Sequence, residues 1–309
     1  MDNICHSMLG AALGRAGLAR TTPLGMSTLI LANNLPDVDV GVFATHTLAM
    51  SFRRGWTHGV LAQLTLPIVL TGVMLLVDRV FRRDAPDRVK VVPLLLLSYL
   101  GVLLHVFLDF LNSYGVRLLM PFSERWFYGD ALYIVDPFLY ATLGLGWWIS
   151  SRRDTSVRPN PFRPARIGLA LAAIYVAGMV GSNALARREV QGGLARAGRS
   201  PDTRFMVTPV FANPLRREVI IDVGDRYEKG HLWFDPLPHF RPAGYGVAKG
   251  LDDPEVQPAL QLPRAQAFLR WSRLPFVQIN PTPPLAGIWL NDYRYASAGP
   301  YGWAAQKLQ

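Results

Sequence analysis

A histidine and an aspartate stand four positions apart, as His105 and Asp109, near the end of a long apolar run over residues 91–112. On a helix, side chains at positions i and i+4 point the same way, so this imidazole and this carboxylate converge on one point. Ionisable side chains within a membrane are candidates for function, and this pair suits zinc or another divalent metal. The alternative is a structural hydrogen bond between the pair that holds two helices together.

Four further positions offer groups that bind metals. His6 and His58 supply imidazoles, and Asp37 and Asp39 supply carboxylates. Together with the first pair they make three nitrogen and three oxygen ligands, enough for one catalytic ion or a close pair of ions. Because Asp37 and Asp39 flank a turn that follows Pro36, the alternative for both is to cap the next helix.

Two more aspartates and two arginines complete the candidate site. Asp130 and Asp136 could be further ligands, could orient the imidazole N–H groups, or could act as the general base. Asp136 precedes Pro137, which is also the pattern of a helix N-cap. Arg53 and Arg54 suit an anionic substrate group such as phosphate, and the alternative is that they only anchor lipid headgroups.

The other histidines are assigned no chemistry. His46 is expected to be a loop histidine, and His231 and His239 lie without partners in a polar C-terminal region that has no Ser-His-Asp, P-loop or dinucleotide motif. Cys5 is the only cysteine, which excludes an intrachain disulfide. The chemistry of the chain is therefore expected in its N-terminal part.

The elements that must position these residues are membrane helices. Half of the 309 residues are hydrophobic, 17% are charged and the mean hydropathy is +0.17. At about 1.5 Å per residue, four segments are long enough to span ~30 Å of hydrocarbon, namely residues 60–77, 91–112, 131–150 and 167–186. Since the N-terminus lacks the basic region of a signal peptide, these helices must direct the chain to the membrane themselves.

The first apolar region is divided into two short pieces, residues 7–19 and 24–34. Each piece would be roughly 17–20 Å long as a helix, which is too short to span the membrane. We predict a tight helical hairpin that enters the membrane and returns. Such a hairpin brings His6 to the same side as Asp37 and Asp39.

The basic loops set the orientation of the spans. Residues 79–90 and 152–166 each carry five Lys or Arg, which predicts that both loops are cytoplasmic. The candidate residues then all fall on the outer side, as expected if they build one site. Much of the net charge of +10 therefore sets topology and gives no reason to expect nucleic-acid binding. One signal is discordant, since five arginines follow the last span on the outer side: Arg187, Arg188, Arg196, Arg199 and Arg204.

The predicted fold class is an all-α polytopic membrane domain followed by a small α+β domain. The membrane domain covers residues 1–186 and consists of the short N-terminal hairpin and four transmembrane helices. A linker over residues 187–203 leads to a β-rich domain at residues 204–309, which is expected outside the cytoplasm.

Strand patterns in the C-terminal domain come in two pairs. Residues 217–223 and 227–234 alternate as strands do and are separated by a turn that contains Gly224. Residues 268–279 and 288–296 could pair likewise. Residues 253–269 could hold a helix with a proline in its first turn.

The candidate residues belong to an ordered series of motifs. In chain order the series is His6, Pro36-Asp-Val-Asp39, Arg54-Gly-Trp-Thr-His58, His105-x-x-x-Asp109, Tyr114-Gly115, Pro121-Phe-Ser123, Asp130 and Asp136-Pro137. Over residues 1–186 the series resembles the YdjM-like family of bacterial inner-membrane proteins, which are described as membrane-bound metal-dependent hydrolases. At one position the chain departs from this family, because Arg53 stands where the family has a histidine and so removes one possible ligand.

The residues and the resemblance together predict a hydrolase of the bacterial inner membrane. One or two divalent ions, zinc first among them, would activate a water that attacks an ester or phosphodiester. A site at the depth of the headgroups favours a lipid-like substrate over other small molecules, and membrane lipids are the expected partners. The alternative is a non-enzymatic membrane protein, either a metal-stabilised scaffold or a transporter. A transporter would place ionisable residues along a path through the midplane, whereas these gather at one end.

Overall fold

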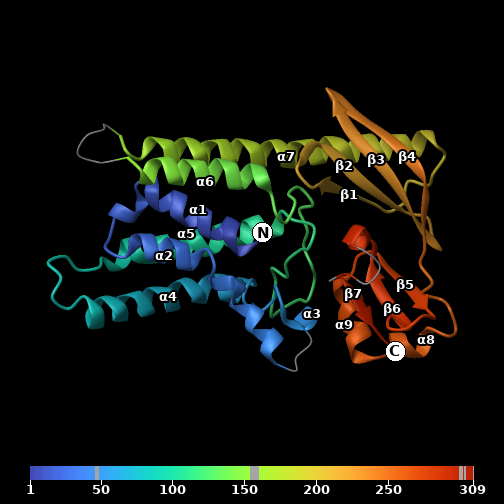
Figure 1. Ribbon diagram of the computed structural model, residues 1–309, viewed down its shortest axis with the longest axis horizontal. Coiled ribbons are helices and arrows are strands. Elements are labelled where there is room, and N and C mark those ends of the chain that lie inside the picture. Colours follow the sequence, from blue (N-terminus) through green and yellow to red (C-terminus); the bar gives the residue numbers. More distant parts are fainter. Residues whose placement is uncertain (46–48, 154–159, 299–301, 303, 309) are drawn as a thin grey trace. The chain divides into compact units, whose positions relative to one another are not determined.

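The computed structural model describes residues 1–45, 49–153, 160–298, 302 and 304–308. The chain divides into two compact units (Figure 1). The first, here called the helical unit, consists of Met1–Gly41, Arg53–Ser182 and Phe211–Pro214. The second, here called the sheet unit, consists of Val42–Phe52, Asn183–Val210 and Leu215–Gln309.

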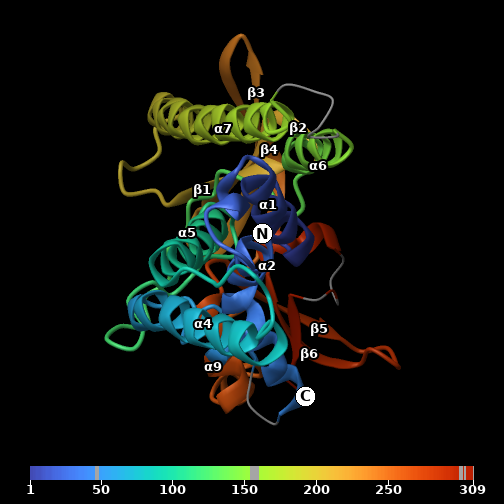
Figure 2. The same cartoon turned by 90° about the vertical axis from the view of Figure 1, so that its left-hand side faces the viewer.

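Helices make up most of the first part of the chain. In order they are α1 (Asn3–Arg15), the short 3-10 helix η1 (Leu18–Arg20), α2 (Gly25–Ala32), the 3-10 helix η2 (Leu35–Ala44), α3 (Ala49–Phe52), α4 (Val60–Phe81), α5 (Val91–Phe110), α6 (Pro137–Ser151) and α7 (Arg163–Arg196). Within the helical unit α1 contacts α2 and α6, and α5 contacts α2 and α4 (Figures 1 and 2).

The structure contains the predicted N-terminal hairpin, formed by α1 and α2. Small residues let its helices approach closely: a Cβ atom on Gly10 would lie 2.7 Å from the carbonyl oxygen of Leu29. Gly101 of α5 faces the side chain of Ala32 at the end of α2 in the same way. These contacts fix the hairpin against the face of α5 on which residues 101, 105 and 109 lie.

Three described helices, α4, α5 and α7, are long and apolar enough to cross a membrane. The predicted count of four spans is not confirmed, because α6 has only 15 residues, roughly 22 Å at about 1.5 Å per residue. The helix begins at Pro137, since the carboxylate of Asp136 caps its first turn. Residues 131 and 132 instead donate backbone hydrogen bonds to the carbonyl oxygen of Leu111.

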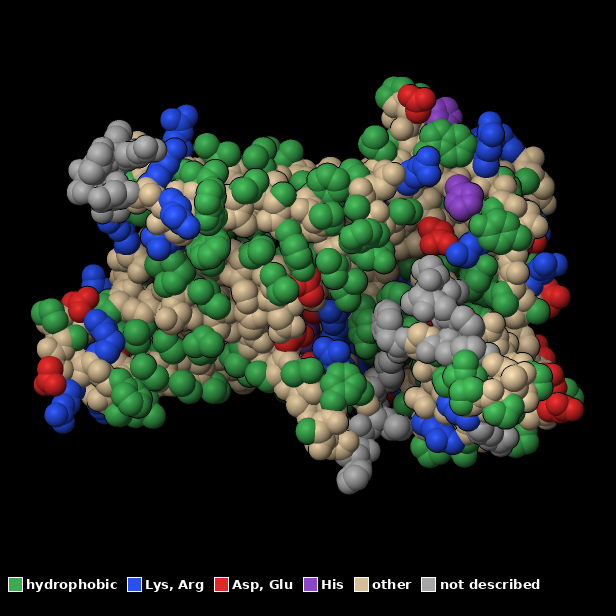
Figure 3. All heavy atoms as spheres, in the orientation of Figure 1, with side chains coloured by type: hydrophobic (Ala, Val, Ile, Leu, Met, Phe, Trp, Pro, Cys, Tyr) green, Lys and Arg blue, Asp and Glu red, His purple; other side chains and the backbone are tan. Residues whose placement is uncertain are grey.

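The outer surface of the helices is apolar. Ile68 and Leu76 on α4, Leu96 on α5 and Ile174 on α7 are each more than half exposed. Figure 3 shows hydrophobic side chains over the helices and Lys and Arg side chains gathered at one end of them. Such a surface suits helices that face lipid.

The sheet unit has two antiparallel sheets. The first has the order β1-β2-β3-β4 and the second the order β5-β6-β7. Their bounds are β1 (Phe205–Val210), β2 (Asn213–Asp222), β3 (Arg226–Asp235), β4 (Leu237–Ala248), β5 (Pro275–Asn280), β6 (Gly287–Asp292) and β7 (Ala305–Lys307), with α8 (Gln257–Leu260) and α9 (Pro263–Trp271) between β4 and β5. One face of the first sheet packs on the end of α7, through Ala186, Val190 and Leu194.

The predicted strand pairs are present in the sheet unit. In the first pair, β2 and β3, Asp222 lies opposite Tyr227. In the second pair, β5 starts only at Pro275, because residues 263–271 form α9. Its partner β6 ends at Asp292 and not at residue 296, because Tyr293–Ala298 form a 3-10 helix. Strands β1, β4 and β7 were not predicted. Strand β4 contains Pro238 and Pro242, which a sheet accepts here because β4 is an edge strand. Helix α7 also continues to Arg196, through residues predicted to be a linker.

Candidate metal centre

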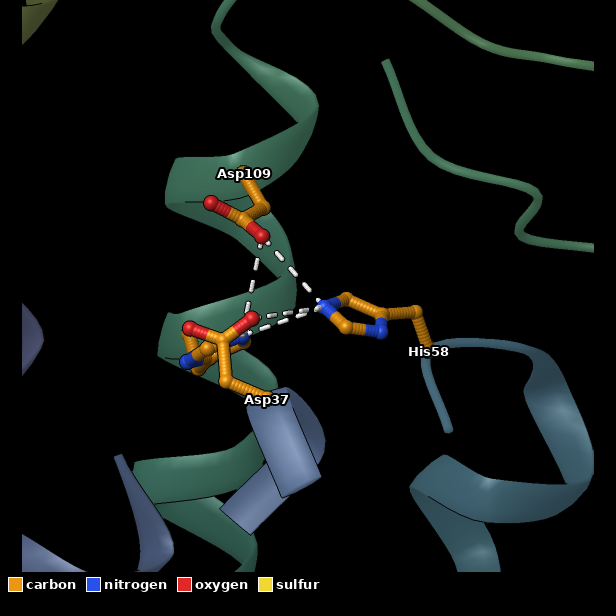
Figure 4. A group of neighbouring side chains, drawn as sticks. Asp37, His58 and Asp109 are labelled. Carbon is orange, nitrogen blue, oxygen red and sulfur yellow. Dashed lines mark hydrogen bonds and ion pairs between the residues drawn. The ribbon is translucent and has the colours of Figure 1, made fainter. Parts of the chain in front are cut away.

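Four buried side chains from separate parts of the helical unit converge on one point (Figure 4). His105 and Asp109 come from the last turns of α5, Asp37 from η2, and His58 from the loop before α4. Each offers one ligand atom, and the four atoms lie within 4.8 Å of one another. Figure 4 shows Asp37, His58 and Asp109 pointing toward one another across the end of α5.

The separations of these atoms fit a single ion. His58 Nε2 lies 3.2 Å from His105 Nε2 and 3.3 Å from Asp109 Oδ2, and His105 Nε2 lies 3.6 Å from Asp109 Oδ2. Asp37 Oδ1 is 3.9 Å from each of the two imidazole nitrogens. A tetrahedral zinc ion with bonds of about 2.0–2.1 Å places its ligand atoms roughly 3.3 Å apart. Three ligand atoms, those of His58, His105 and Asp109, therefore lie close to the separation expected around zinc, and Asp37 Oδ1 lies farther from the two imidazoles.

The hydrogen bonding of the two carboxylates also fits a cation. Asp37 Oδ1 and Asp109 Oδ2 are buried, yet neither accepts a hydrogen bond from the described residues. A buried acceptor without a partner costs about 1–3 kcal/mol, and more when it is charged. The two oxygens without donors are the two that face the histidines. A divalent ion bound among the four atoms would satisfy both of them.

Hydrogen bonds orient both histidines with Nε2 toward this point. His105 Nδ1 lies 2.6 Å from the carbonyl oxygen of Asn33, so this nitrogen carries the proton. The hydroxyl of Thr57 donates to Asp39 Oδ2 at 3.2 Å, and its oxygen lies 2.9 Å from His58 Nδ1. Since the hydroxyl proton is used, His58 Nδ1 must be the donor. Both Nε2 atoms therefore present a lone pair, as metal ligands do.

Asp39 lies behind His58 and outside the group of four. Its Oδ2 accepts hydrogen bonds from Thr57 and, at 2.7 Å, from the backbone N–H of Arg54. Its Oδ1 lies 3.4 Å from Nε of Arg53. With both oxygens engaged, this carboxylate orients His58 instead of facing the other donors.

The second oxygen of Asp109 faces cationic groups. Oδ1 lies 3.2 Å from Nη2 of Arg54, which is only 4% exposed, and it also contacts the amino group of Met1. His6 Nε2 lies 3.4 Å from the same oxygen, and its ring stacks on His105 with centroids 3.8 Å apart. His6 is thus adjacent to the group of four without belonging to it. These contacts occupy Oδ1 and leave Oδ2 for an ion.

Burial controls the protonation of the two site residues outside the spans. It lowers the pKa of His58 well below the usual value, and the neighbouring His105 and Arg54 act in the same direction. Burial raises the pKa of Asp37, against the opposing effect of Arg54. A neutral imidazole is the form that binds a metal.

The two aspartates assigned to catalysis do not belong to the group of four. Asp136 caps α6 through Oδ1, and its Oδ2 accepts a hydrogen bond of 2.8 Å from the hydroxyl of Tyr175. Asp130 is fully buried and has a φ of +52°. Its neighbours Gly129 and Ala131 donate backbone hydrogen bonds to residues 110 and 111 at the end of α5. The catalytic role of both residues stays a prediction.

The two arginines occupy different places. Arg53 lies 3.9 Å from Asp37 Oδ1, and its side chain is 23% exposed. Arg54 points inward and donates to the side-chain oxygen of Asn112 at 3.2 Å. His231 lies on β3 and His239 on β4, both in the sheet unit. His46 lies outside the described residues.

Sequence reasoning missed three contacts made by uncharged residues. His105 binds the backbone carbonyl oxygen of Asn33, His58 binds the hydroxyl of Thr57, and Arg54 binds the side-chain oxygen of Asn112. The polarity of Asn112 at the end of an apolar helix was a signal for the last contact, whereas a backbone carbonyl gives no signal in the residue type. Which groups these residues reach depends on how the helices pack.

Comparison with known proteins agrees with a membrane location. A family model described as YdjM inner membrane protein matches residues 1–185, which include the whole group of four. The "Uncharacterized protein YfhP" of Bacillus subtilis (strain 168) is 28% identical over an alignment of 151 residues, covering 45% of this chain and 43% of that protein. The chain therefore spans less than half the length of this relative. No solved structure matches. The chain belongs to the YdjM inner membrane protein family.

Proposed function

We propose that the chain is a membrane-bound, metal-dependent hydrolase that acts on an ester or phosphodiester. The observation that carries the proposal is the convergence of two imidazole nitrogens with two buried carboxylate oxygens that lack hydrogen-bond donors among the described residues. Membership of an inner-membrane family supports the location.

We propose that the metal centre holds one ion. A second ion would lie ~3.5–4 Å from the first and need its own ligands, whereas the four donor atoms lie within 4.8 Å of one another. Mixed imidazole and carboxylate donors suit zinc best among the common metals. When bound, the ion would lower the pKa of a water and polarise the scissile group.

The four residues have different proposed roles. His58, His105 and Asp109 are separated by only 3.2–3.6 Å and would hold the ion. Asp37, at 3.9 Å from both imidazoles, would accept the proton of the attacking water on Oδ1. Asp136 is a weaker candidate for this base, because its carboxylate already caps α6 and binds Tyr175.

The proposed substrate carries an anionic or polar headgroup. Arg53 is the partly exposed arginine beside Asp37, and this position supports a role in binding a phosphate or carboxylate group of a substrate. The centre lies at one end of α5, a helix apolar enough to span the membrane. A site at the end of a span lies near headgroup depth, which favours a lipid-like molecule.

A metal-stabilised scaffold is the second candidate function. It is favoured by one observation: all four donors are buried, and four protein ligands are typical of structural zinc sites. In that case the ion would hold η2, the loop before α4 and α5 together without turnover.

Hydrolysis assays on the full chain distinguish the two functions. Zinc-loaded protein in detergent would be given bis(p-nitrophenyl) phosphate, a p-nitrophenyl ester and a fluorogenic phospholipid. The hydrolase predicts turnover that a chelator abolishes, with a loss of roughly 100-fold or more in Asp37→Asn, as expected for removal of a general base. Asp84→Asn, in an exposed loop, is the matched control and should keep the wild-type rate.

The same assay tests the assignment of the base. If Asp130→Asn or Asp136→Asn lost turnover while Asp37→Asn kept it, the base would be assigned wrongly. Zinc that stabilises the fold without turnover of any of these substrates would favour the scaffold.

A further inference from the structure

An apolar groove lies between α6 and the first part of α7, two segments of the helical unit. None of the four residues of the metal centre lines it. The groove has a volume of about 480 Å³, within the ~300–1,000 Å³ typical of small-molecule pockets. We call it the α6–α7 groove.

Glycines form the floor of the groove, because they let the two helices approach closely. A Cβ atom on Gly146 would lie 3.1 Å from the Cα atom of Gly168, and one on Gly168 would clash with the carbonyl oxygen of Thr142. The helices therefore meet backbone to backbone at this point. The space between the larger side chains on either side stays open.

Apolar side chains form the two walls of the groove. Leu145 and Ile149 stand one turn apart on α6. Ile167 and Leu171 stand one turn apart on α7, which is long and apolar enough to cross a membrane. Leu145, Ile167 and Leu171 are each about half exposed. Such walls suit a groove that opens toward lipid and accepts an acyl chain.

Two arginines lie at one end of the groove. Arg153 follows the end of α6, Arg163 begins α7, and both line the groove. The hydroxyl of Ser150 donates a hydrogen bond of 2.6 Å to the carbonyl oxygen of Pro161, which holds the end of α6 beside the start of α7. The Nε atom of Arg153 is buried and donates to no group among the described residues. An oxygen atom of a ligand at this end of the groove would accept its hydrogen bond.

The segment that joins α6 to α7 is strongly basic, whatever ion pairs form within it. Residues 152–166 contain five arginines and one acidic residue, Asp154. A single carboxylate can offset only one of five positive charges. An anionic headgroup is the complementary ligand, since guanidinium groups match phosphate oxygens and basic residues beside a span attract anionic lipids.

The basic end of the groove is remote from the metal centre. Helix α6 begins near the end of α5 that carries the metal centre, because residues 131 and 132 donate backbone hydrogen bonds to Leu111. The two arginines lie at the other end of α6, which has 15 residues and is roughly 22 Å long at about 1.5 Å per residue. Figure 1 shows α6 and α7 side by side, and Figure 3 shows Lys and Arg side chains at this end of the helices.

We infer that the α6–α7 groove binds an anionic phospholipid, with one acyl chain along the groove and the phosphate group at Arg153 and Arg163. The acyl chain fills the space above Gly146 and Gly168, and the phosphate offsets part of the charge of the basic segment. A lipid held here is a bound component of the membrane domain and is distinct from the substrate of the proposed hydrolase.

The test measures lipid binding to the delipidated full chain in detergent by native mass spectrometry. The protein is titrated with dioleoyl phosphatidylglycerol or with dioleoyl phosphatidylcholine, which share their acyl chains and differ in charge. Arg153→Gln and Arg163→Gln each remove a charge that lines the groove. Arg83→Gln is the matched control, because it removes an exposed charge from loop 79–90, outside the groove. Ala141→Phe fills the groove, and Ala170→Phe places the same side chain at an exposed position of α7 that does not line it.

We expect the wild type to bind phosphatidylglycerol more tightly than phosphatidylcholine. Arg153→Gln and Arg163→Gln should each weaken binding of phosphatidylglycerol about fivefold and leave phosphatidylcholine unchanged. Ala141→Phe should weaken binding of both lipids about tenfold or more, because the acyl chain loses contacts of several methylenes. Both control variants should bind the two lipids as the wild type does.

Three results would overturn the proposal. They are equal affinity of the wild type for the two lipids, equal effects of Arg163→Gln and Arg83→Gln, and unchanged lipid binding in Ala141→Phe. A dimer that Ala141→Phe alone disrupts would assign the groove to a second copy of the chain instead. Hydrolysis by the metal centre is measured separately, so failure of one proposal is distinct from failure of the other.

Discussion

His58 is oriented by a chain of three residues, and this chain defines what the imidazole can do. Asp39 accepts a hydrogen bond from Thr57, whose oxygen in turn accepts one from His58 Nδ1. The chain leaves Nε2 as the only lone pair on the imidazole. Residues that never touch the ion can therefore set its affinity.

Replacement of Thr57 tests this orientation. Thr57→Val removes the hydroxyl but keeps the shape, so the affinity for Zn²⁺ should fall roughly 10- to 100-fold, the usual loss when such an orienting contact is removed. Thr57→Ser restores the hydroxyl and should bind nearly as the wild type does. Competition with a chromogenic chelator measures both affinities. Equal affinities for the Val and Ser variants would mean that Thr57 does not orient His58.

The two carboxylates of the metal centre should respond differently to loss of charge in the metal-free protein. Asp109→Asn removes the carboxylate charge that lies 3.2 Å from the buried guanidinium of Arg54, which should destabilise the fold by about 3–5 kcal/mol. Asp37→Asn removes a buried carboxylate oxygen that lacks a donor, so stability should hold or rise while zinc affinity falls. Thermal unfolding of chelator-treated protein measures both changes. A larger loss in Asp37→Asn than in Asp109→Asn would contradict these assignments.

At the scale of elements, the hairpin of α1 and α2 positions the metal centre from one side. The carbonyl oxygen that binds His105 belongs to Asn33, immediately after α2. The close contact between Gly101 and Ala32 holds α2 against α5 one turn before this histidine. Packing between these two helices is thus coupled to the direction of a proposed ligand.

A larger residue at this contact should weaken metal binding without changing any ligand. Gly101→Leu forces α2 away from α5, which we expect to cost about 1–3 kcal/mol and to lower zinc affinity. Gly72→Leu on α4 is the matched control, because a Cβ atom there meets no atom within 4 Å. Thermal unfolding and zinc titration measure the two effects. If Gly101→Leu and Gly72→Leu bound zinc equally well, the hairpin would not position the site.

The pattern of elements shows what a sequence can predict. The hairpin and the spans α4 and α5 follow from the lengths of apolar runs between polar breaks. The start of α6 does not follow from the apolar run, which extends back to Ala131. The helix begins only at Pro137, after the cap at Asp136. Strand β4 was missed because its prolines argue against a strand, and its edge position becomes known only from the sheet order.

The same limit applies to the site. The segment Pro36-Asp-Val-Asp39 predicts two ligating carboxylates, Asp37 and Asp39. The sequence gives no reason to distinguish them. The fold separates them: Asp37 faces the histidines, and Asp39 accepts the N–H of Arg54. The contacts of Arg54 with Asp109 and Asn112 likewise depend on tertiary packing.

At the scale of the whole molecule, the proposed orientation places the basic loops inside and the metal centre outside. A cysteine introduced at position 125 in a chain without Cys5 should react with a membrane-impermeant thiol reagent in intact spheroplasts. A cysteine at position 84 should react only after permeabilisation, since loop 79–90 is predicted to be cytoplasmic. Both positions are exposed, so a difference in labelling shows on which side of the membrane each position lies. Labelling at 84 with none at 125 would invert the topology.

The central claim is that one divalent ion is held by His58, His105 and Asp109, with Asp37 beside it. Elemental analysis of the full chain, purified in detergent and equilibrated with limiting Zn²⁺, tests this most directly. We expect about one ion per chain in the wild type, as for a single metal site. The same content is expected in His231→Ala, which alters the sheet unit. Folded His105→Ala and Asp109→Ala proteins should hold at least about tenfold less metal, and full metal content in both would contradict the account.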